Sequence, residues 1–367
     1  MTSPKTFIIA EAGVNHNGSL DMARKLIDVA VGAGVDAVKF QTFKAERLIS
    51  RHAAKADYQK ATTDAAETQL DMVRRLELDA AAHAALIDYA RQSGIAFLST
   101  AFDDESVDLL AKEFDLPTIK IPSGEITNGP LLFKVGHAGK RVILSTGMST
   151  IDEVELALGA LAFGYLGRSD PSPEEFRKAF ADGRALLSEH VSLLHCTTEY
   201  PAPFDEINLR AMDTLKVTFG LPVGLSDHSS GIAIPIAAVA RGACIIEKHF
   251  TVDRRLPGPD HRASLEPAEL KAMVTGIRQV EMALGDGRKV PTAAESKNAL
   301  IARKSLVAAR EVRKGEPFNG DNLTAKRPGT GLSPMQYWAA LGRFADRDYL
   351  PDDMLSTVSL ETNPYRT

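Results

Sequence analysis

The chain has 367 residues, 44% of them hydrophobic and 25% charged, which is typical of a globular protein with one large and one small domain. Its 43 Lys and Arg residues and 48 Asp and Glu residues give a net charge of −5, without a long run of either sign. This balance argues against a nucleic-acid surface and against a basic membrane face, so we expect small molecules as partners.

The N-terminal segment indicates the cellular compartment, and the positions of the cysteines indicate whether they are reactive. The apolar run at residues 7–10 is followed at once by Glu11, which is typical neither of a signal peptide nor of a spanning helix, so we expect a cytoplasmic protein. The two cysteines, Cys196 and Cys244, make no disulfide framework. Both lie in apolar runs and are predicted to be buried thiols rather than ligands or nucleophiles.

Short β-rich runs alternate with helical patterns along the first 285 residues. The predicted strands are residues 7–12, 37–41, 95–100, 118–121, 142–145, 191–196, 223–226 and 244–250. The helices that follow them are predicted at residues 20–33, 69–92, 105–114, 130–137, 151–162, 209–215, 232–241 and 267–284. Eight such units predict an α/β fold, the (β/α)₈ TIM barrel.

A doubly wound open sheet is the alternative architecture, but the first strand lacks the Gly-x-Gly-x-x-Gly turn of a dinucleotide site. Two connections are long, residues 42–68 after the second strand and 164–190 before the sixth. Connections of this size are usually functional or contain helices of their own. The second leads into the amino end of a strand, on the bottom face of a barrel, and we expect it to be structural.

The composition changes after Gly285. Residues 288–298 are polar, and short strands and turns follow from Arg303 onward. We therefore expect a barrel domain at residues 1–285, a linker at 286–302 and a small β-rich domain at 303–367.

A polar residue lies at or just beyond the carboxyl end of each predicted strand, where TIM barrels carry their active sites. One group offers two cations and four hydroxyl groups. Its members are Lys39, Lys120, Thr100, Ser123, Ser145 and Ser226. Two ammonium groups in a ring of hydroxyls suit a phosphate dianion, and nearby glycines let backbone N–H groups approach it.

A second group has the chemistry of a metal site. His228 and His249 end the last two predicted strands, and these strands and the first, which carries Glu11, become neighbours when a barrel closes. One carboxylate and two imidazoles, with Gln41 nearby, suit Mn²⁺, Mg²⁺ or Zn²⁺ with positions left open for water. A phosphate pocket beside such a metal indicates a phosphorylated enol or carbonyl compound that meets a second, polarised carbonyl.

Ordered motifs along the chain resemble those of the sialic acid (nonulosonate) synthase family. They are IAEAGVNHNG at 9–18, VKFQTFK at 38–44, KIPSGE at 120–125, LSTGM at 144–148, HCTTEYP at 195–201, GLSDH at 224–228, EKHFT at 247–251 and PGPDH at 257–261. The segment LTAKRPGTGLSP at 323–334 resembles that family's antifreeze-protein-like (SAF) domain. The resemblance runs to residue 350 and implies a TIM barrel with a C-terminal SAF domain.

The resemblance implies a transferase that condenses phosphoenolpyruvate with the open-chain aldehyde of an N-acetylmannosamine-type sugar, releasing phosphate and a nine-carbon 2-keto acid. By motif, His228 and His249 would hold a divalent metal, Mn²⁺ or Mg²⁺, and the first group above would bind the phosphate. Glu125 would transfer a proton, and Glu11 would hold the metal's water ligands or the sugar. The remaining substrate contacts would be Gln41, Tyr200 and Asp260.

The resemblance also implies a domain-swapped homodimer, in which Arg327 of the small domain binds the sugar in the partner's barrel. Thr197 favours synthases of the diacetylated sugar legionaminate over N-acetylneuraminate synthases. Two alternatives use the same residues differently. A Schiff-base aldolase would use Lys39 or Lys120 as its nucleophile without a metal, and a sugar-binding module would need neither the phosphate set nor the metal set.

Overall fold

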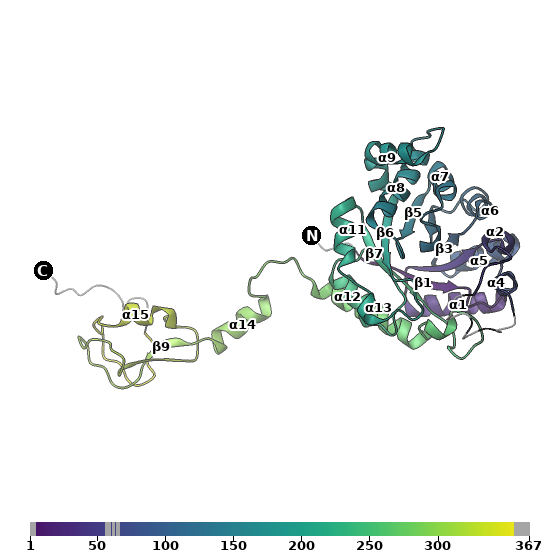
Figure 1. Cartoon of the computed structure of the whole chain (residues 1–367). Coiled ribbons are helices and arrows are strands. Elements are labelled where there is room, and N and C mark those ends of the chain that lie inside the picture. The colour runs from purple at the N-terminus through teal and green to yellow at the C-terminus, as the bar shows by residue number, and fades with distance from the viewer. Residues whose placement is uncertain (1–4, 56–59, 61–62, 64–66, 356–367) are drawn as a thin grey trace. The chain divides into compact units, whose positions relative to one another are not determined.

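The computed structural model describes residues 5–55, 60, 63 and 67–355 of the chain (Figure 1). The chain divides into two compact units, Met1–Asp286 and Gly287–Thr367. Each unit has a hydrophobic core of its own. A helix with the length and apolarity to span a membrane does not occur among the described residues.

Eight parallel strands close into a barrel in chain order, and β1 pairs with both β2 and β8. The strands are β1 (Phe7–Gly13), β2 (Ala37–Thr42), β3 (Ala96–Ala101), β4 (Thr118–Ile121), β5 (Arg141–Ser145), β6 (Val191–Cys196), β7 (Val223–Asp227) and β8 (Ile245–His249). β4 and β6 have the predicted bounds, β3 and β8 differ by one residue at both ends, and the others differ by one residue at one end. The closed barrel confirms the predicted fold and excludes the open sheet.

Alternation along the strands stacks two layers of side chains inside the barrel, because every second residue of a strand points inward. The lower layer is apolar and consists of Ile9, Ala37, Leu98, Ile143, Leu194 and Ile245. Two residues further along the same six strands stand Glu11, Lys39, Thr100, Ser145, Cys196 and Glu247. The barrel is therefore closed by hydrocarbon at its amino end and becomes polar toward its carboxyl end.

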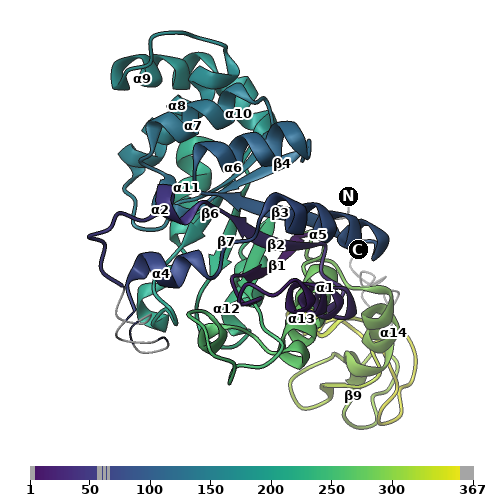
Figure 2. The same cartoon turned by 90° about the vertical axis from the view of Figure 1, so that its right-hand side faces the viewer.

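Helices surround the strands (Figures 1 and 2). They are α1 (Leu20–Ala33), α2 (Ala45–Leu48), α4 (Gln69–Arg74), α5 (Ala80–Gln92), α6 (Asp104–Asp108), α7 (Gly129–His137), α8 (Ile151–Tyr165), α9 (Pro173–Asp182), α10 (Arg184–His190), α11 (Ala211–Phe219), α12 (Ala233–Ala240) and α13 (Pro267–Ala283). α1 shows why they form. The Ser19 side chain accepts a hydrogen bond from the Met22 N–H at its start, and Gly34 ends it at φ 79°.

Two predicted helices differ from the structure in kind, whereas the others differ at most in where they begin or end. The helix expected at residues 69–92 is wrong, because it is divided into α4 and α5. The Asp79 side chain accepts a hydrogen bond from the Ala82 N–H and so starts a new helix within the apolar pattern. The helix expected at 105–114 begins as α6 and continues as the π-helical turn Leu109–Glu113.

The long connection before β6 contains α9 and α10, and α9 packs on the outer side of α8 (Figure 2). The Phe163 and Phe176 rings meet edge to face at 5.4 Å. A Cβ atom on Gly159 would lie 2.3 Å from the Phe176 carbonyl oxygen, so the close approach of the two helices requires glycine there. This connection adds an outer layer of helices to the barrel.

The C-terminal unit begins with α14 (Ala293–Ala302), a helix within the segment that we expected to be a linker. A capping box between Thr292 and Glu295 starts this helix, but none of its side chains is buried within the chain. Beyond it, β9 (Ser305–Ala308) pairs antiparallel with β10 (Leu323–Lys326), and α15 (Tyr337–Ala340) follows. Their core is formed by Leu306, Ala308, Val312, Phe318, Leu323, Leu332, Ala340, Ala345, Tyr349 and Leu355.

Candidate active site

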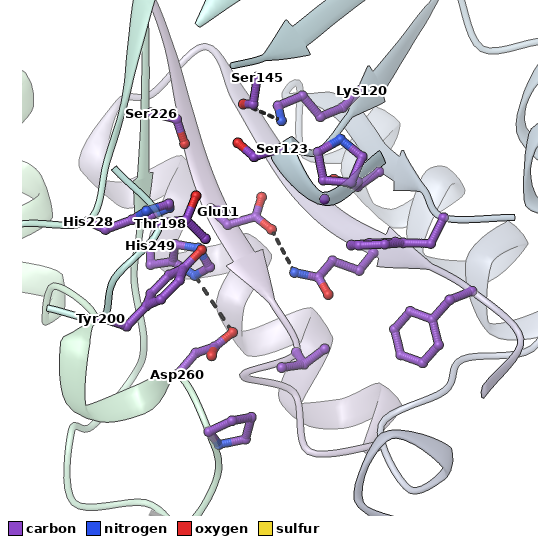
Figure 3. Close-up of a pocket in the computed structure, with 18 of the residues that line it drawn as sticks. Glu11, Lys120, Ser123, Ser145, Thr198, Tyr200, Ser226, His228, His249 and Asp260 are labelled. Carbon is purple, nitrogen blue, oxygen red and sulfur yellow. Dashed lines mark hydrogen bonds and ion pairs between the residues drawn. The ribbon is translucent and has the colours of Figure 1, made fainter. Parts of the chain in front are cut away.

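A cavity of 320 Å³ opens at the carboxyl ends of the barrel strands (Figure 3). It brings together twelve of the fourteen predicted site residues: Glu11, Lys39, Gln41, Thr100, Lys120, Ser123, Ser145, Tyr200, Ser226, His228, His249 and Asp260. Glu125 does not line this cavity. Arg327 belongs to the C-terminal unit.

The bottom of the cavity, which we call the polar floor, is built around Glu11, Lys39, Lys120 and Glu247. The Lys39 Nζ lies 2.5 Å from Glu11 Oε2 and 3.6 Å from Glu247 Oε2, and it donates to the Thr100 hydroxyl at 2.8 Å. These charged side chains are at most 5% exposed. Ionised groups this deep in a protein require partners, and here the partners are one another.

Lys120 completes the polar floor from the opposite side. Its Nζ donates to the Ser145 hydroxyl at 2.7 Å and to the Ile121 carbonyl at 3.1 Å, and it lies 3.8 Å from Glu247 Oε1. Glu247 also accepts a hydrogen bond from the Ser226 hydroxyl at 2.8 Å. Glu247 therefore joins both lysines, although the sequence interpretation assigned it no role.

The two carboxyl groups of the polar floor differ in acidity. Burial, the largest influence, raises the pKa of Glu11 to about 7, although Lys39 opposes this effect. Burial also disfavours ionised Glu247, but Lys120 and Lys39 together lower its pKa to about 2. With both carboxyl groups ionised, the charges of the two lysines and the two glutamates cancel, and the polar floor is neutral overall. Protonation of Glu11 would leave one positive charge, which would favour a bound anion.

The two predicted metal ligands meet at the edge of the polar floor, with ring centroids 5.4 Å apart. His228 Nδ1 lies 2.7 Å from the Thr197 carbonyl, an arrangement that keeps a proton on Nδ1 and makes Nε2 the nitrogen that would bind a metal. The Tyr200 ring lies over His228, with centroids 4.1 Å apart. Burial lowers the pKa of His249 well below its usual range, and His228 lowers it further, so that imidazole is neutral.

The donor set fits a divalent cation with an incomplete protein shell. His249 Nδ1 is buried without a hydrogen-bond partner among the described residues, and Asp260 Oδ2 lies 3.9 Å from it. The same part of the chain contains no group of three or more His, Cys, Asp or Glu side chains arranged to hold a metal. Burial lowers the pKa of His228, but Cys196 beside it outweighs this effect and raises it, so a bound cation would have to displace a proton there. The two imidazoles would leave most coordination positions to water or substrate, as catalytic sites require.

An ion pair behind the histidines fixes the strands that carry them. Asp227 and Lys248 are paired in the register of β7 and β8, and Lys248 Nζ lies 2.6 Å from Asp227 Oδ2, with both side chains 1% exposed. Asp227 also accepts hydrogen bonds from the Ser229 N–H and hydroxyl, each at 3.0 Å. Because neighbouring strand residues face opposite sides, this outer pair leaves His228 and His249 facing the cavity.

The Asn-His-Asn-Gly segment at residues 15–18 holds the loop that carries Asp260. The Asn15 amide donates to the Phe250 carbonyl at 2.8 Å and to the Ser264 hydroxyl at 2.9 Å, and Ser264 in turn donates to the Asp260 carbonyl at 2.6 Å. The Asn17 amide donates to the Pro257 carbonyl at 2.8 Å. The pKa of Asp260 is raised to about 6 by its burial.

Glu125, the predicted proton-transfer residue, lies in the 3₁₀ turn Ser123–Glu125 and is half-buried. Its Oε2 accepts a hydrogen bond from the Asn128 amide at 2.7 Å. Burial raises the pKa of this carboxyl group. In the same turn, the Ser123 hydroxyl accepts from the Gly147 N–H at 2.9 Å and faces the cavity.

Two further cavity residues were not recognised as site residues. Thr198 lines the cavity, and a Cβ atom on Gly147 would lie 2.4 Å from its hydroxyl, so glycine is required where these loops meet. Cys196 is buried, as predicted for an apolar run, but it also lines the cavity, with its Sγ 3.7 Å from His228 Nδ1. Its inward position two residues after Leu194 would have indicated this placement.

The side of the cavity above β1, β2 and β3 is apolar, which the sequence interpretation did not anticipate. We call it the apolar wall and define it as Val14, Phe43, Leu48, Ile49, Met72, Val73, Leu76 and Phe102. Five of these residues lie in the connection after β2 and in α4. The connection at residues 42–68 was expected to be functional or to contain helices, and its described part contains α2 and lines the cavity.

Known proteins are similar to this chain over nearly its whole length. Residues 26–289 match the NeuB family, and residues 303–361 match the SAF domain. An N,N'-diacetyllegionaminic acid synthase of Campylobacter jejuni is 53% identical over 96% of this chain and 99% of its own length. An enzyme of the same name from Legionella pneumophila is 44% identical over 91% of this chain and 89% of its own.

Solved structures agree with this comparison. The crystal structure of an N-acetylneuraminic acid (sialic acid) synthetase from Leptospira borgpetersenii, in complex with citrate, is 35% identical and superimposes with a TM-score of 0.66. The alignment covers 80% of this chain and 90% of that one.

Proposed function

The chain belongs to the NeuB family, and we propose that it is a nonulosonate synthase that makes N,N'-diacetyllegionaminate. Its substrates would be phosphoenolpyruvate and the open-chain aldehyde of 2,4-diacetamido-2,4,6-trideoxymannose. One observation carries the proposal. A single cavity joins the polar floor, which includes Lys39 and Lys120, to the histidine pair His228 and His249.

The polar floor would bind phosphoenolpyruvate. Lys120 and the hydroxyl groups of Ser123, Ser145 and Ser226 lie together at one end of the cavity (Figure 3). Their donors would hold the phosphate, while Lys39 and Thr100 would take its remaining oxygens or the carboxylate. Because these groups are already held by Glu11 and Glu247, little reorganisation is needed at the moment of reaction.

The histidine pair would orient the sugar aldehyde. The donor set fits a divalent cation such as Mn²⁺ or Mg²⁺, which His228 and His249 would hold and which would supply Lewis-acid polarisation of the aldehyde oxygen. Tyr200, Asp260 and Gln41 surround the same space and would contact the sugar. Their convergence would hold the aldehyde carbon over the enol carbon bound below.

The bond changes can be assigned to these groups. The enol carbon C3 of phosphoenolpyruvate attacks the aldehyde carbon, and C2 becomes an oxocarbenium centre to which water adds. The phosphate then leaves with cleavage of the C2–O bond, and Lys39, Lys120 and the hydroxyls stabilise its charge. Glu11, whose pKa lies at about 7, can hold or release a proton beside this centre. We keep Glu125 as a candidate that would act through water.

For a Schiff-base aldolase the nucleophile would have to be a neutral amine. Lys39 does not suit this role, because Glu11 and Glu247 raise its pKa and keep it charged despite its burial. Burial lowers the pKa of Lys120, so Lys120 is the nucleophile that this alternative would use, and borohydride trapping with pyruvate would detect it. A sugar-binding module would have no use for two buried lysines and four hydroxyls at the polar floor. No contact in the described residues favours either alternative.

The assembly is a separate proposal. We propose that two chains form a domain-swapped homodimer, with Arg327 of one chain reaching the cavity of the other and binding the sugar. Arg327 is exposed within its own chain, where its Nε donates to the Ala302 carbonyl at 2.9 Å. A single exposed backbone contact leaves most of the guanidinium donors available to a ligand.

Phosphate release tests the function directly. The purified protein is incubated with phosphoenolpyruvate, Mn²⁺ and either N-acetylmannosamine or 2,4-diacetamido-2,4,6-trideoxymannose, and free phosphate is measured. We expect release that depends on the sugar and is faster with the diacetamido sugar. Absence of phosphate release with both sugars would contradict the proposed synthase, and faster release with N-acetylmannosamine would contradict the proposed product.

A further inference from the structure

The apolar wall of the cavity has no role in binding phosphate or a metal. Val14, Phe43 and Leu76 form a small separate hydrophobic cluster, against which Leu48, Val73 and Phe102 pack. Phe43 and Phe102 meet edge to face at 6.1 Å. Leu48, Val73 and Phe102 are only partly buried and line the cavity, so they offer apolar surface to its contents.

Strand alternation places this wall above the polar floor. Along β2, Lys39 and Gln41 point inward, and Phe43 follows at the next inward position. Along β3 the same step leads from Thr100 to Phe102. Phosphoenolpyruvate held at the level of the lysines would therefore lie beneath the wall, and the second substrate would occupy the space beside it.

The position of the aldehyde determines which end of the sugar meets the wall. His228 follows β7 and His249 ends β8, and β8 pairs with β1, so the histidines stand beside the strands that lead into the wall. With the aldehyde carbon at the histidines, the far end of an open-chain sugar can extend over β1 to β3. That end carries a methyl group and a 4-acetamido group in the diacetamido sugar, but a hydroxymethyl and a hydroxyl group in N-acetylmannosamine.

The charge distribution points the same way. The acidic and basic side chains that line the cavity belong to the polar floor or to the rim at His228, His249 and Asp260. Among the described lining residues, the wall side contributes apolar groups and the amides of Gln41 and Gln69. Apolar groups suit two methyls and amides suit an acetamido group. Among the cavity-lining residues that the structure describes, the wall side offers no cation to a 6-phosphate on the sugar.

We propose that the apolar wall is the specificity site for the distal half of the acceptor sugar and selects a 6-deoxy, 4-acetamido sugar over one with free hydroxyl groups. This proposal rests on the proposed synthase function and identifies the residues that would recognise the distal half of the sugar. Apolar pockets discriminate modestly. A methyl group is worth about 10-fold to 200-fold in kcat/KM, and an added hydroxyl is rejected by about 100-fold.

The test uses wall substitutions that keep side-chain size. Val73→Thr and Leu48→Asn place polar atoms at two partly exposed wall positions, alone and combined, so folding should be little affected. Val31→Thr makes the same change on the outer helix α1, at a position that is 39% exposed, and serves as the matched control. The measurements are kcat/KM for each sugar with saturating phosphoenolpyruvate, and the KM for phosphoenolpyruvate.

We expect the double variant to lose about 10-fold in kcat/KM for the diacetamido sugar while kcat/KM for N-acetylmannosamine is unchanged or rises. The KM for phosphoenolpyruvate should stay at the wild-type value, which also shows that the polar floor is intact. A sugar ratio equal to that of the wild type, or an equal loss with both sugars, would overturn the specificity site while leaving the synthase function standing. A wild-type protein inactive with both sugars would overturn both proposals.

Discussion

The polar floor and the apolar wall of the cavity are built in different ways. The floor residues Glu11, Lys39, Lys120 and Glu247 stand on strands whose hydrogen-bonded register fixes their positions. The wall residues come mostly from short helices and connections after β2 and β3. Reaction chemistry therefore lies on the rigid part of the barrel, and sugar selection lies on segments that can vary without disturbing it.

The histidines give the strongest test of the division between a reactive side and a sugar-selecting side of the cavity. We expect His228→Ala or His249→Ala to lower phosphate release more than about 100-fold, because loss of outer-shell partners alone costs 10-fold to 100-fold. EDTA should have the same effect on the wild type, with recovery on addition of Mn²⁺. Circular dichroism should show an unchanged fold. Turnover near the wild-type rate in either variant would rule out the metal assignment.

The lysine–glutamate network of the polar floor should affect both stability and phosphoenolpyruvate binding. Lys120→Met leaves Glu247 short of one cation, so we expect a loss of about 3 kcal/mol in the free energy of unfolding. Adding Glu247→Gln should recover much of that stability, but kcat/KM for phosphoenolpyruvate should stay about 100-fold low. Urea unfolding and steady-state kinetics measure the two effects.

Lys134→Met is the matched control for this prediction, because Lys134 pairs with Asp108 outside the cavity. It should leave the kinetics unchanged. If the double variant regained phosphoenolpyruvate binding together with stability, the network would be structural and the polar floor would have another function.

The outer ion pair should act on the histidines without touching a substrate. We expect Asp227→Asn to weaken Mn²⁺ binding about 10-fold, the lower end of the effect of outer-shell partners. Mn²⁺ binding is measured on the protein without substrates by electron paramagnetic resonance, separately from activity. Wild-type Mn²⁺ affinity in this variant would show that the pair serves only the fold.

The smallest effect is expected at the C-terminal unit. Arg327→Ala should raise the KM of the sugar several-fold and leave the KM of phosphoenolpyruvate unchanged, since the proposed contact is with the sugar alone. Arg343→Ala, another exposed arginine of the same unit, is the control. Equal changes in both KM values would contradict a sugar contact by Arg327.

Regular alternation made the barrel and the polar floor predictable from the sequence. Each floor residue follows an apolar run at a fixed step, and the chain order of strands is also their order in the barrel. Glu247 was missed because the segment at 247–251 was interpreted through His249 alone. Strand alternation leads to Phe43 and Phe102 of the apolar wall, but no period links them to Val14 and Leu48, so the wall as a whole could not be predicted.

Helix caps were overlooked in two other places. The apolar pattern from 69 to 92 is continuous, yet Asp79 caps a second helix within it. Residues 286–302 are polar and remain a predicted linker, but the capping box at Thr292 starts α14 within them. In both places a single cap outweighed the composition of the segment.

The central claim, that the polar floor releases phosphate from an enol that has formed a carbon–carbon bond, is tested most directly with an isotope. Phosphoenolpyruvate labelled with ¹⁸O in its bridging oxygen is turned over with the diacetamido sugar and Mn²⁺, and the released phosphate is examined by ³¹P nuclear magnetic resonance. We predict that the label leaves in the phosphate, because the C2–O bond breaks. Unlabelled phosphate would mean attack at phosphorus and would contradict this account.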